Sequence, residues 1–286
     1  MTQLATAPTP GAPGLLNPGV RRAARRTLPW RWLLVLVAGA GLFAAVSATL
    51  VATHDLLFIP SLLLLGAAVV PATFTTLVTE SMASHTLTLA RVLTAAVLGG
   101  VVGAVLAGLL EFGTRQVLGS LPYLMVGLIE EAAKLAVPVA LFAWGRSRGR
   151  AMDGLVLGVA AGSGFAALET MGYGFVALLA SHGQLEAVDG LLITRALASL
   201  GAHAAWTGLA AAAWFGIGSA RRRWLGRARF ALSFATVVIL HTLWDATVAG
   251  GFYRWIAAIS FLLLVGTATH LYRRTPREDV QMVLRP

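Results

Sequence analysis

Long apolar runs constrain the fold of this chain more than any other feature. Stretches of mostly apolar residues follow one another along nearly all of its 286 residues, and only 12% of the residues are charged. The hydrocarbon core of a bilayer, roughly 30 Å thick, needs about 20 apolar residues in each helix that crosses it. Average soluble domains are about 25% charged. The sequence therefore predicts an all-α, polytopic membrane protein rather than a soluble globular domain.

Eight runs are long enough to cross a bilayer as helices. We expect spans at residues 30–52, 56–78, 87–110, 119–143, 151–180, 191–217, 228–250 and 252–272. Together they form a transmembrane domain over residues 30–274, with a short cytoplasmic tail at 275–286. No internal repeat relates the spans, which argues against a transporter built from inverted repeats.

The segment before the first span is rich in Ala, Thr, Pro and Gly and ends in several arginines. Such a composition buries too little apolar surface to order the chain, so we expect residues 1–29 to be a disordered basic tail. A cleaved signal peptide is the competing interpretation. Its apolar core is about 7–15 residues long, whereas the run that begins at Trp30 is longer, which favours an uncleaved helix.

The distribution of arginine agrees with eight spans. An even number of spans puts both termini on one side, and the arginine-rich segments fall on that side. The opposite side holds only Arg115, Arg195 and Arg254. By the positive-inside rule both termini are cytoplasmic. Topology then accounts for the net charge of +10, so we expect a lipid bilayer and no nucleic acid as partner. The absence of cysteine excludes disulfides, thiolate ligands and cysteine nucleophiles.

Ionisable residues inside the spans are the candidates for function, because each costs about 2.5–3.5 kcal/mol at the bilayer centre. The fourth span carries Glu130, Glu131 and Lys134; the fifth carries Glu169, the sixth His203, and the seventh His241 and Asp245. Counted at 1.5 Å per residue, four of the expected helices place a carboxylate or imidazole about 13–18 Å below the outer surface. Scattered polar residues that only join helices need not share one depth.

Helical spacing adds detail to these candidates. Lys134 follows Glu130 by four residues and Glu131 by three, so it can neutralise one carboxylate and leave the other to react. His241 and Asp245 share a helix face, which suits two ligands of one ion or a histidine oriented by a carboxylate. Histidine and carboxylate from several helices are ligands that zinc prefers. Structural roles are the alternative: a lone histidine often joins helices, and Ser163 between glycines is interpreted as close packing.

Four motifs in order resemble the PrsW family of bacterial intramembrane proteases, which are distantly related to the CAAX prenyl proteases and bacteriocin-processing enzymes. The motifs are EEAAK (130–134), DGLVLGVAAGSGFAALE (153–169), RALASLGAHAAW (195–206) and HTLWD (241–245). The resemblance covers about residues 119–250, without the first three spans. It implies catalytic roles for Glu130, Glu131 and Glu169, with Glu130 as the base that activates water. It implies metal ligation by His203, His241 and Asp245.

The resemblance also implies an activity and a location. The chain would be a metallopeptidase of the bacterial cytoplasmic membrane that cleaves a membrane-anchored protein, with an anti-sigma factor as the family's known kind of substrate. A divalent metal, with zinc as the first candidate, would assist, although glutamate and histidine alone can also activate water. A proton- or cation-coupled transporter that uses Glu130, Glu169 and Asp245 is the alternative from another class. A non-catalytic membrane scaffold is a third interpretation.

Overall fold

The computed structural model describes residues 30–82, 87–144 and 150–283, and all regular secondary structure assigned in these residues is helical. The predicted all-α class is therefore confirmed. The tail predicted at residues 1–29 lies outside the described residues. At the other end the last helix continues to Val283, within the segment expected to be a C-terminal tail.

The helices follow the predicted spans with one exception. In chain order they are α1 (Arg31–Thr53), α2 (Ile59–Met82), α3 (Leu89–Leu118), α4 (Tyr123–Trp144), α5 (Ala151–Ala180), α6 (Leu185–Ala198), α7 (His203–Phe215), α8 (Arg223–Thr247) and α9 (Tyr253–Val283). Among the described residues, six segments are long and apolar enough to cross a membrane: α1, α2 with the turn before it, α3, α5, α8 and most of α9. Helix α4 has 22 residues but carries three charges in one stretch of five.

The exception is the sixth predicted span, residues 191–217, which is not one helix. Helix α6 ends at Ala198, a 3-10 turn covers Ser199–Gly201, and Ala202 has φ −118° and ψ −116° before α7 begins. The Ser199 hydroxyl donates to the Ala196 carbonyl at 2.6 Å. The backbone of Gly201 lies so close to that of Ala257 in α9 that a Cβ would collide with it. The break makes His203 the first residue of a new helix.

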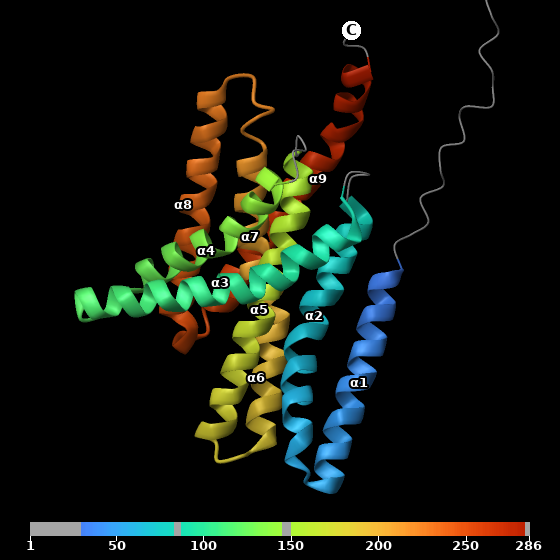
Figure 1. The fold of residues 1–286 in the computed structure, drawn as a ribbon, viewed down its shortest axis with the longest axis vertical. Helices are drawn as coiled ribbons and strands as arrows, with labels where there is room; N and C mark the ends of the chain where they lie inside the picture. Colours follow the sequence, from blue (N-terminus) through green and yellow to red (C-terminus); the bar gives the residue numbers. More distant parts are fainter. Residues whose placement is uncertain (1–29, 83–86, 145–149, 284–286) are drawn as a thin grey trace, which may run out of the picture.

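The connections alternate between two ends of the molecule (Figure 1). Helix α1 descends in this view and α2 returns; α5 descends, α6 and α7 ascend, α8 descends and α9 rises to the C-terminal end. The α7–α8 connection and the end of α9 lie toward the upper end of this view, whereas α1 begins near mid-height. Helix α3 crosses in front of α5 at a steep angle. The chain has the architecture of a multi-pass membrane protein.

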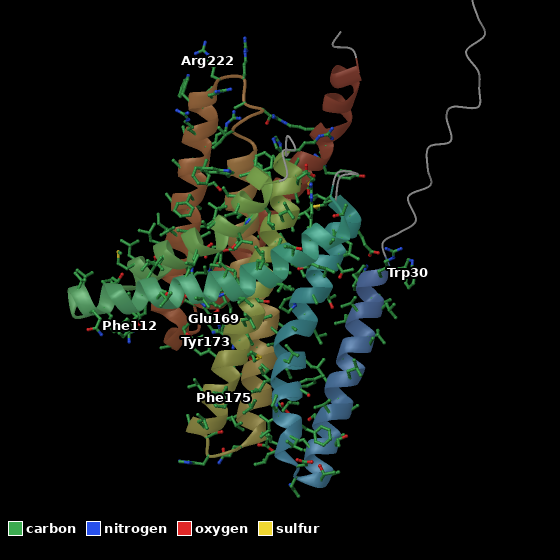
Figure 2. The ribbon with its side chains drawn as sticks, in the orientation of Figure 1. Trp30, Phe112, Glu169, Tyr173, Phe175 and Arg222 are labelled. Atoms are coloured by element: carbon green, nitrogen blue, oxygen red, sulfur yellow. The ribbon has the colours of Figure 1, made fainter. Side chains whose placement is uncertain are left out.

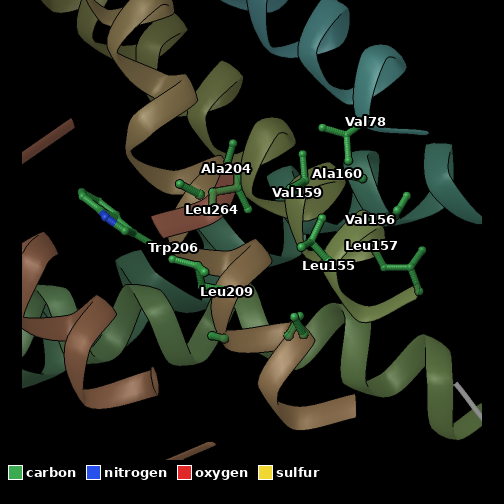
Figure 3. Close-up of a cluster of buried hydrophobic side chains, with 14 of the residues drawn as sticks. Val78, Leu155, Val156, Leu157, Val159, Ala160, Ala204, Trp206, Leu209 and Leu264 are labelled. Carbon is green, nitrogen blue, oxygen red and sulfur yellow. The ribbon is translucent and has the colours of Figure 1, made fainter. Parts of the chain in front are cut away.

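Helix α5 lies at the centre of this arrangement. In its apolar 18-residue stretch 78% of the residues are buried, against 6% in the corresponding stretch of α1. Helix α5 packs against α2, α3, α4, α6 and α7. Figure 3 shows side chains of α5, among them Leu155, Val156 and Val159, packed beside Trp206 and Leu209 of α7. Burial on all sides holds α5 in one orientation, and with it Glu169 near the middle of the molecule.

Small residues allow this close packing. Gly154, Gly158 and Gly162 recur every four residues along the face of α5 that meets α7. A Cβ at Gly162 would collide with the carbonyl oxygen of His203, and one at Gly158 with that of Thr207. Because the two backbones touch, the first turn of α7, which carries His203, is positioned directly by α5.

We expect Gly158→Ala to destabilise the chain by about 1–3 kcal/mol, because the added methyl group forces α5 and α7 apart. Gly172→Ala is the matched control on the same helix, since nothing lies within 4 Å of its added Cβ. It should leave stability unchanged or raise it by up to about 1 kcal/mol. Denaturant unfolding of both purified variants in detergent measures the difference. Equal stabilities of the two variants would refute the close contact.

Candidate active site

The structure brings all six predicted site residues together, along with Lys134. Helix α4 contributes Glu130 and Glu131, α5 contributes Glu169, α7 contributes His203, and α8 contributes His241 and Asp245. In Figure 2 Glu169 lies on α5 near the level where α3 crosses, with Tyr173 one turn further along. Residues separated by up to 115 positions in the sequence therefore meet within one group of polar and charged side chains.

The ammonium group of Lys134 lies at the centre of this group. Its Nζ donates to Glu130 Oε2 at 3.1 Å and to His203 Nδ1 at 2.8 Å. It also forms an ion pair with Glu131 Oε1 at 2.7 Å. The side chain is fully buried, and Nζ lies 4.3 Å from the centroid of the Phe165 ring. One cation thus contacts both carboxylates of its own helix and the histidine of α7.

These contacts define which nitrogen of each histidine carries a proton. An ammonium group can only donate, so His203 Nδ1 accepts from Lys134 and the proton of the neutral ring is on Nε2. A carboxylate accepts, so His241 Nδ1 donates to Glu131 Oε1, at 2.9 Å. His241 Nε2 then faces Glu130 Oε2 and Asp245 Oδ2, each at 3.6 Å. Glu131 is thereby held from two sides and in turn orients His241.

The other side of His203 faces Glu169. The Nε2 atom of His203 and the Nη2 atom of Arg195 lie 2.8 Å and 2.9 Å from the same oxygen, Glu169 Oε2. The guanidinium group of Arg195 also stacks over the ring of Tyr173, 3.9 Å from its centroid. Lys134 therefore supplies positive charge at the centre of the group, and Arg195 supplies it at the side of Glu169.

Aromatic rings enclose the group on the side of the chain termini. Trp206 stacks on His241, with ring centroids 4.7 Å apart and planes at 23°, and its indole Nε1 donates to Ser260 at 2.9 Å. Further along, Phe142 of α4 packs on Phe215 of α7 with centroids 4.5 Å apart. Large apolar side chains thus separate the polar group from that side of the molecule.

Exposure increases in the opposite direction. The side chains of Lys134 and Glu131 are 0% exposed, and those of His241 and His203 are 2% and 6% exposed. The side chains of Glu169 and Asp245 are 22% and 24% exposed. The group is therefore sealed at Lys134 and open where α5 and α8 present these two carboxylates.

Three of these side chains could hold a metal ion. Glu130, His203 and His241 each offer one ligand atom, and the three atoms lie within 4.8 Å of one another. One carboxylate and two imidazoles form a donor set found in catalytic zinc sites. The carboxylate of Glu131 on the far nitrogen of His241 is the kind of outer partner that orients a ligating histidine. The residues present therefore fit a divalent metal.

The sequence analysis placed Arg195 at the outer end of the predicted span 191–217 and gave it no role in the site. In the structure Arg195 lies in the last turn of α6, because the chain breaks between α6 and α7 inside that span. It stands eight residues before His203, in the same motif, and that spacing was the available signal. Two further polar residues of α5 lie buried in the structure. Asp153 accepts from the backbone N–H of Arg150 at the start of α5, and Ser163 Oγ has no hydrogen-bond partner among the described residues.

The fold and the buried group define the class of protein: a multi-pass helical membrane protein with glutamate and histidine gathered inside its spans. A family model described as PrsW family intramembrane metalloprotease matches residues 28–269, and the chain belongs to this family. It is thus a metallopeptidase by family. The match includes the first three spans, so the resemblance limited to residues 119–250 was too short. The searches of curated proteins and of solved structures found no match.

We expect Lys134→Met to destabilise the chain by about 3–5 kcal/mol, because it leaves Glu130 and Glu131 buried without their cation. Combining it with Glu131→Gln should restore part of that loss, since one carboxylate fewer then needs a partner. Unfolding of the single and double variants in detergent measures both changes. A double variant less stable than Lys134→Met alone would contradict the ion pair.

Cysteine labelling can test the open side, because the chain has no cysteine of its own. We expect Asp245→Cys to react with a membrane-impermeant maleimide applied from the side opposite the chain termini, as His182→Cys in the α5–α6 turn should. Thr207→Cys, at a fully buried position, should stay unlabelled until the protein is denatured. Equal labelling rates at positions 245 and 207 in the native protein would refute the conclusion that the group is open at Asp245 and sealed on the side of Thr207.

Proposed function

We propose that the chain hydrolyses a peptide bond of a membrane-anchored protein, with Glu130 as the base that activates water. The observation that carries the proposal is the convergence of α4, α5, α7 and α8 on one buried group of carboxylates and imidazoles around Lys134. Such groups are costly within a membrane, so their assembly on four helices indicates a chemical role.

The surroundings of the two adjacent glutamates support different roles. Glu130, with a side chain 10% exposed, lies between the sealed end and the open side. Glu131 is fully buried and is held by Lys134 and by His241. We therefore assign water activation to Glu130 and the positioning of His241 to Glu131. Glu169 faces His203 from the open side and is the third proposed catalytic glutamate.

Peptide hydrolysis then follows from these groups. Water enters from the open side and transfers a proton to Glu130 as its oxygen attacks the peptide carbonyl carbon. The oxyanion that forms is stabilised by the positive charge of Lys134. Glu130 returns the proton to the amide nitrogen as the C–N bond breaks, which releases an amine and a carboxylic acid, and the proton of the acid then passes to the amine. In this assignment Glu130, Glu131 and Lys134 each have a role in the reaction.

For a bound divalent metal, Glu130, His203 and His241 are the proposed ligands, with Asp245 facing His241 from the open side. When bound, zinc supplies a Lewis acid and lowers the pKa of a water ligand to about 7. Lys134 Nζ lies on Glu130 and His203, so we expect its ammonium group to withdraw from both when an ion is loaded.

The position of the opening bears on the substrate. The open carboxylates lie away from the end of the molecule that carries the α7–α8 connection with Arg221, Arg222 and Arg223. With cytoplasmic termini, the opening faces the outer half of the bilayer. We therefore propose a substrate cleaved at or near the outer surface of the bacterial cytoplasmic membrane, with a single-span anti-sigma factor as the first candidate.

A proton relay is the alternative function. It would use the continuous series of contacts that runs from Arg195 through Glu169, His203, Lys134 and Glu131 to His241.

The experiment that decides between protease and relay compares new protein N-termini in membranes from cells that make the native chain or Glu130→Gln. The host should lack its own copy and be exposed to envelope stress. We expect a cleaved membrane protein with the native chain only, because an amide cannot take the proton from water.

Glu186→Gln is the matched control, since it makes the same exchange at an exposed glutamate of α6, and it should cleave as the native chain does. If no new terminus appears although all three chains accumulate equally, the protease proposal fails. Proton uptake into liposomes that disappears with Glu130→Gln would then support the relay.

A further inference from the structure

Arg195 connects two helices at the open side of the group. It lies in the last turn of α6, and its Nη2 atom is 2.9 Å from Glu169 Oε2 on α5. The same guanidinium group lies over the ring of Tyr173, which is one helical turn beyond Glu169. Two neighbouring side chains of α5 thus hold the guanidinium, one through charge and one through its ring face.

Glu169 needs such a support because it is one of the two partly open members of the group. Its side chain is 22% exposed, and the other close contact of its Oε2 atom is His203 Nε2 at 2.8 Å. A glutamate side chain has several freely rotating bonds, so one contact leaves it able to swing toward the opening. A second contact from Arg195 on the same oxygen restricts it to the side of His203.

The orientation of Glu169 matters for His203. Because Nδ1 of His203 accepts from Lys134, the ring proton is on Nε2, which faces Glu169. An acceptor fixed at Nε2 keeps the proton there and keeps the Nδ1 lone pair directed toward Lys134 and Glu130. If Glu169 swings away, no contact on the open side holds the ring, so the ring can turn, Nδ1 can leave Lys134, and the tautomer is no longer fixed.

We propose that Arg195, stacked on Tyr173, is a positioning residue that holds Glu169 against His203 Nε2 and thereby keeps the His203 ring in the orientation in which Nδ1 contacts Lys134, on which its tautomer depends. The inference adds residues outside the predicted site, and only its activity readout rests on the proposed function. Arginine suits this place because its planar guanidinium stacks on a ring while it binds a carboxylate, which the ammonium of lysine does not.

The direct test is the tautomer of His203, measured by ¹⁵N NMR on the full chain labelled at its six histidines in lipid nanodiscs. Loss of a signal in His203→Gln assigns the residue. We expect the native chain to show one tautomer, protonated at Nε2, and Arg195→Gln to show a mixture. Tyr173→Leu should also give a mixture, whereas Tyr173→Phe, which keeps the ring face, should retain the native tautomer.

The second readout is turnover of the substrate found by the N-terminus comparison. We expect Arg195→Gln to lower kcat about tenfold or more, the scale of a lost charge-assisted contact, with KM little changed. Arg195→Lys should have a kcat above that of Arg195→Gln but below that of the native chain. Arg254→Gln is the matched control, because Arg254 is an exposed arginine that also lies over a tyrosine, Tyr253 at 5.8 Å, away from the group. It should match the native chain.

The two proposals fail in different ways. An unchanged His203 tautomer in both Arg195→Gln and Tyr173→Leu would overturn the positioning role, whatever happens to turnover. A changed tautomer with unchanged kcat would overturn the link to catalysis and leave the clamp as a structural contact. If the native chain cleaves nothing while the tautomer still depends on Arg195, the positioning role stands and the protease proposal fails.

Discussion

The ammonium group of Lys134 balances two carboxylates in an interior that offers them no water. Taking a charge out of water costs several kcal/mol unless a partner is present, so Glu130 and Glu131 depend on this side chain. The partnership begins within one helix, where spacings of three and four residues bring the groups together. It then extends outward, because Lys134 also binds His203 and Glu131 also binds His241. The charge balance of α4 thus fixes the places of α7 and α8.

Much of this molecule could be predicted from its apolar runs, and the exceptions have physical causes. The bounds of α5 coincide with the predicted span at 151–180. The break at Ala202 could not be predicted, because apolar residues continue on both sides of it and no proline interrupts them. It depends instead on the contact of Gly201 with α9. Hydropathy indicates how long an apolar segment is and whether it is buried, whereas a helix break depends on which backbones come into contact.

The site shows the same division between what a sequence pattern indicates and what packing decides. Depth along each span predicted that Glu130, Glu169, His203 and His241 share a layer, and the structure places them in one group. The pairing of particular atoms depends on how far each helix is rotated about its axis, which the apolar pattern leaves open here. Arg195 received no role in the predicted site for this reason. In the structure a carboxylate and an aromatic ring bury most of it.

The order of the helices along the chain has a consequence for biosynthesis. Glu130, Glu131 and Lys134 leave the ribosome together and can neutralise one another from the start. His203 follows about seventy residues later, and His241 last of the buried group. A nascent chain therefore carries an incomplete buried group until α8 has inserted. Until then the charges of α4 are balanced within their own helix, without the full set of histidine contacts that α7 and α8 supply.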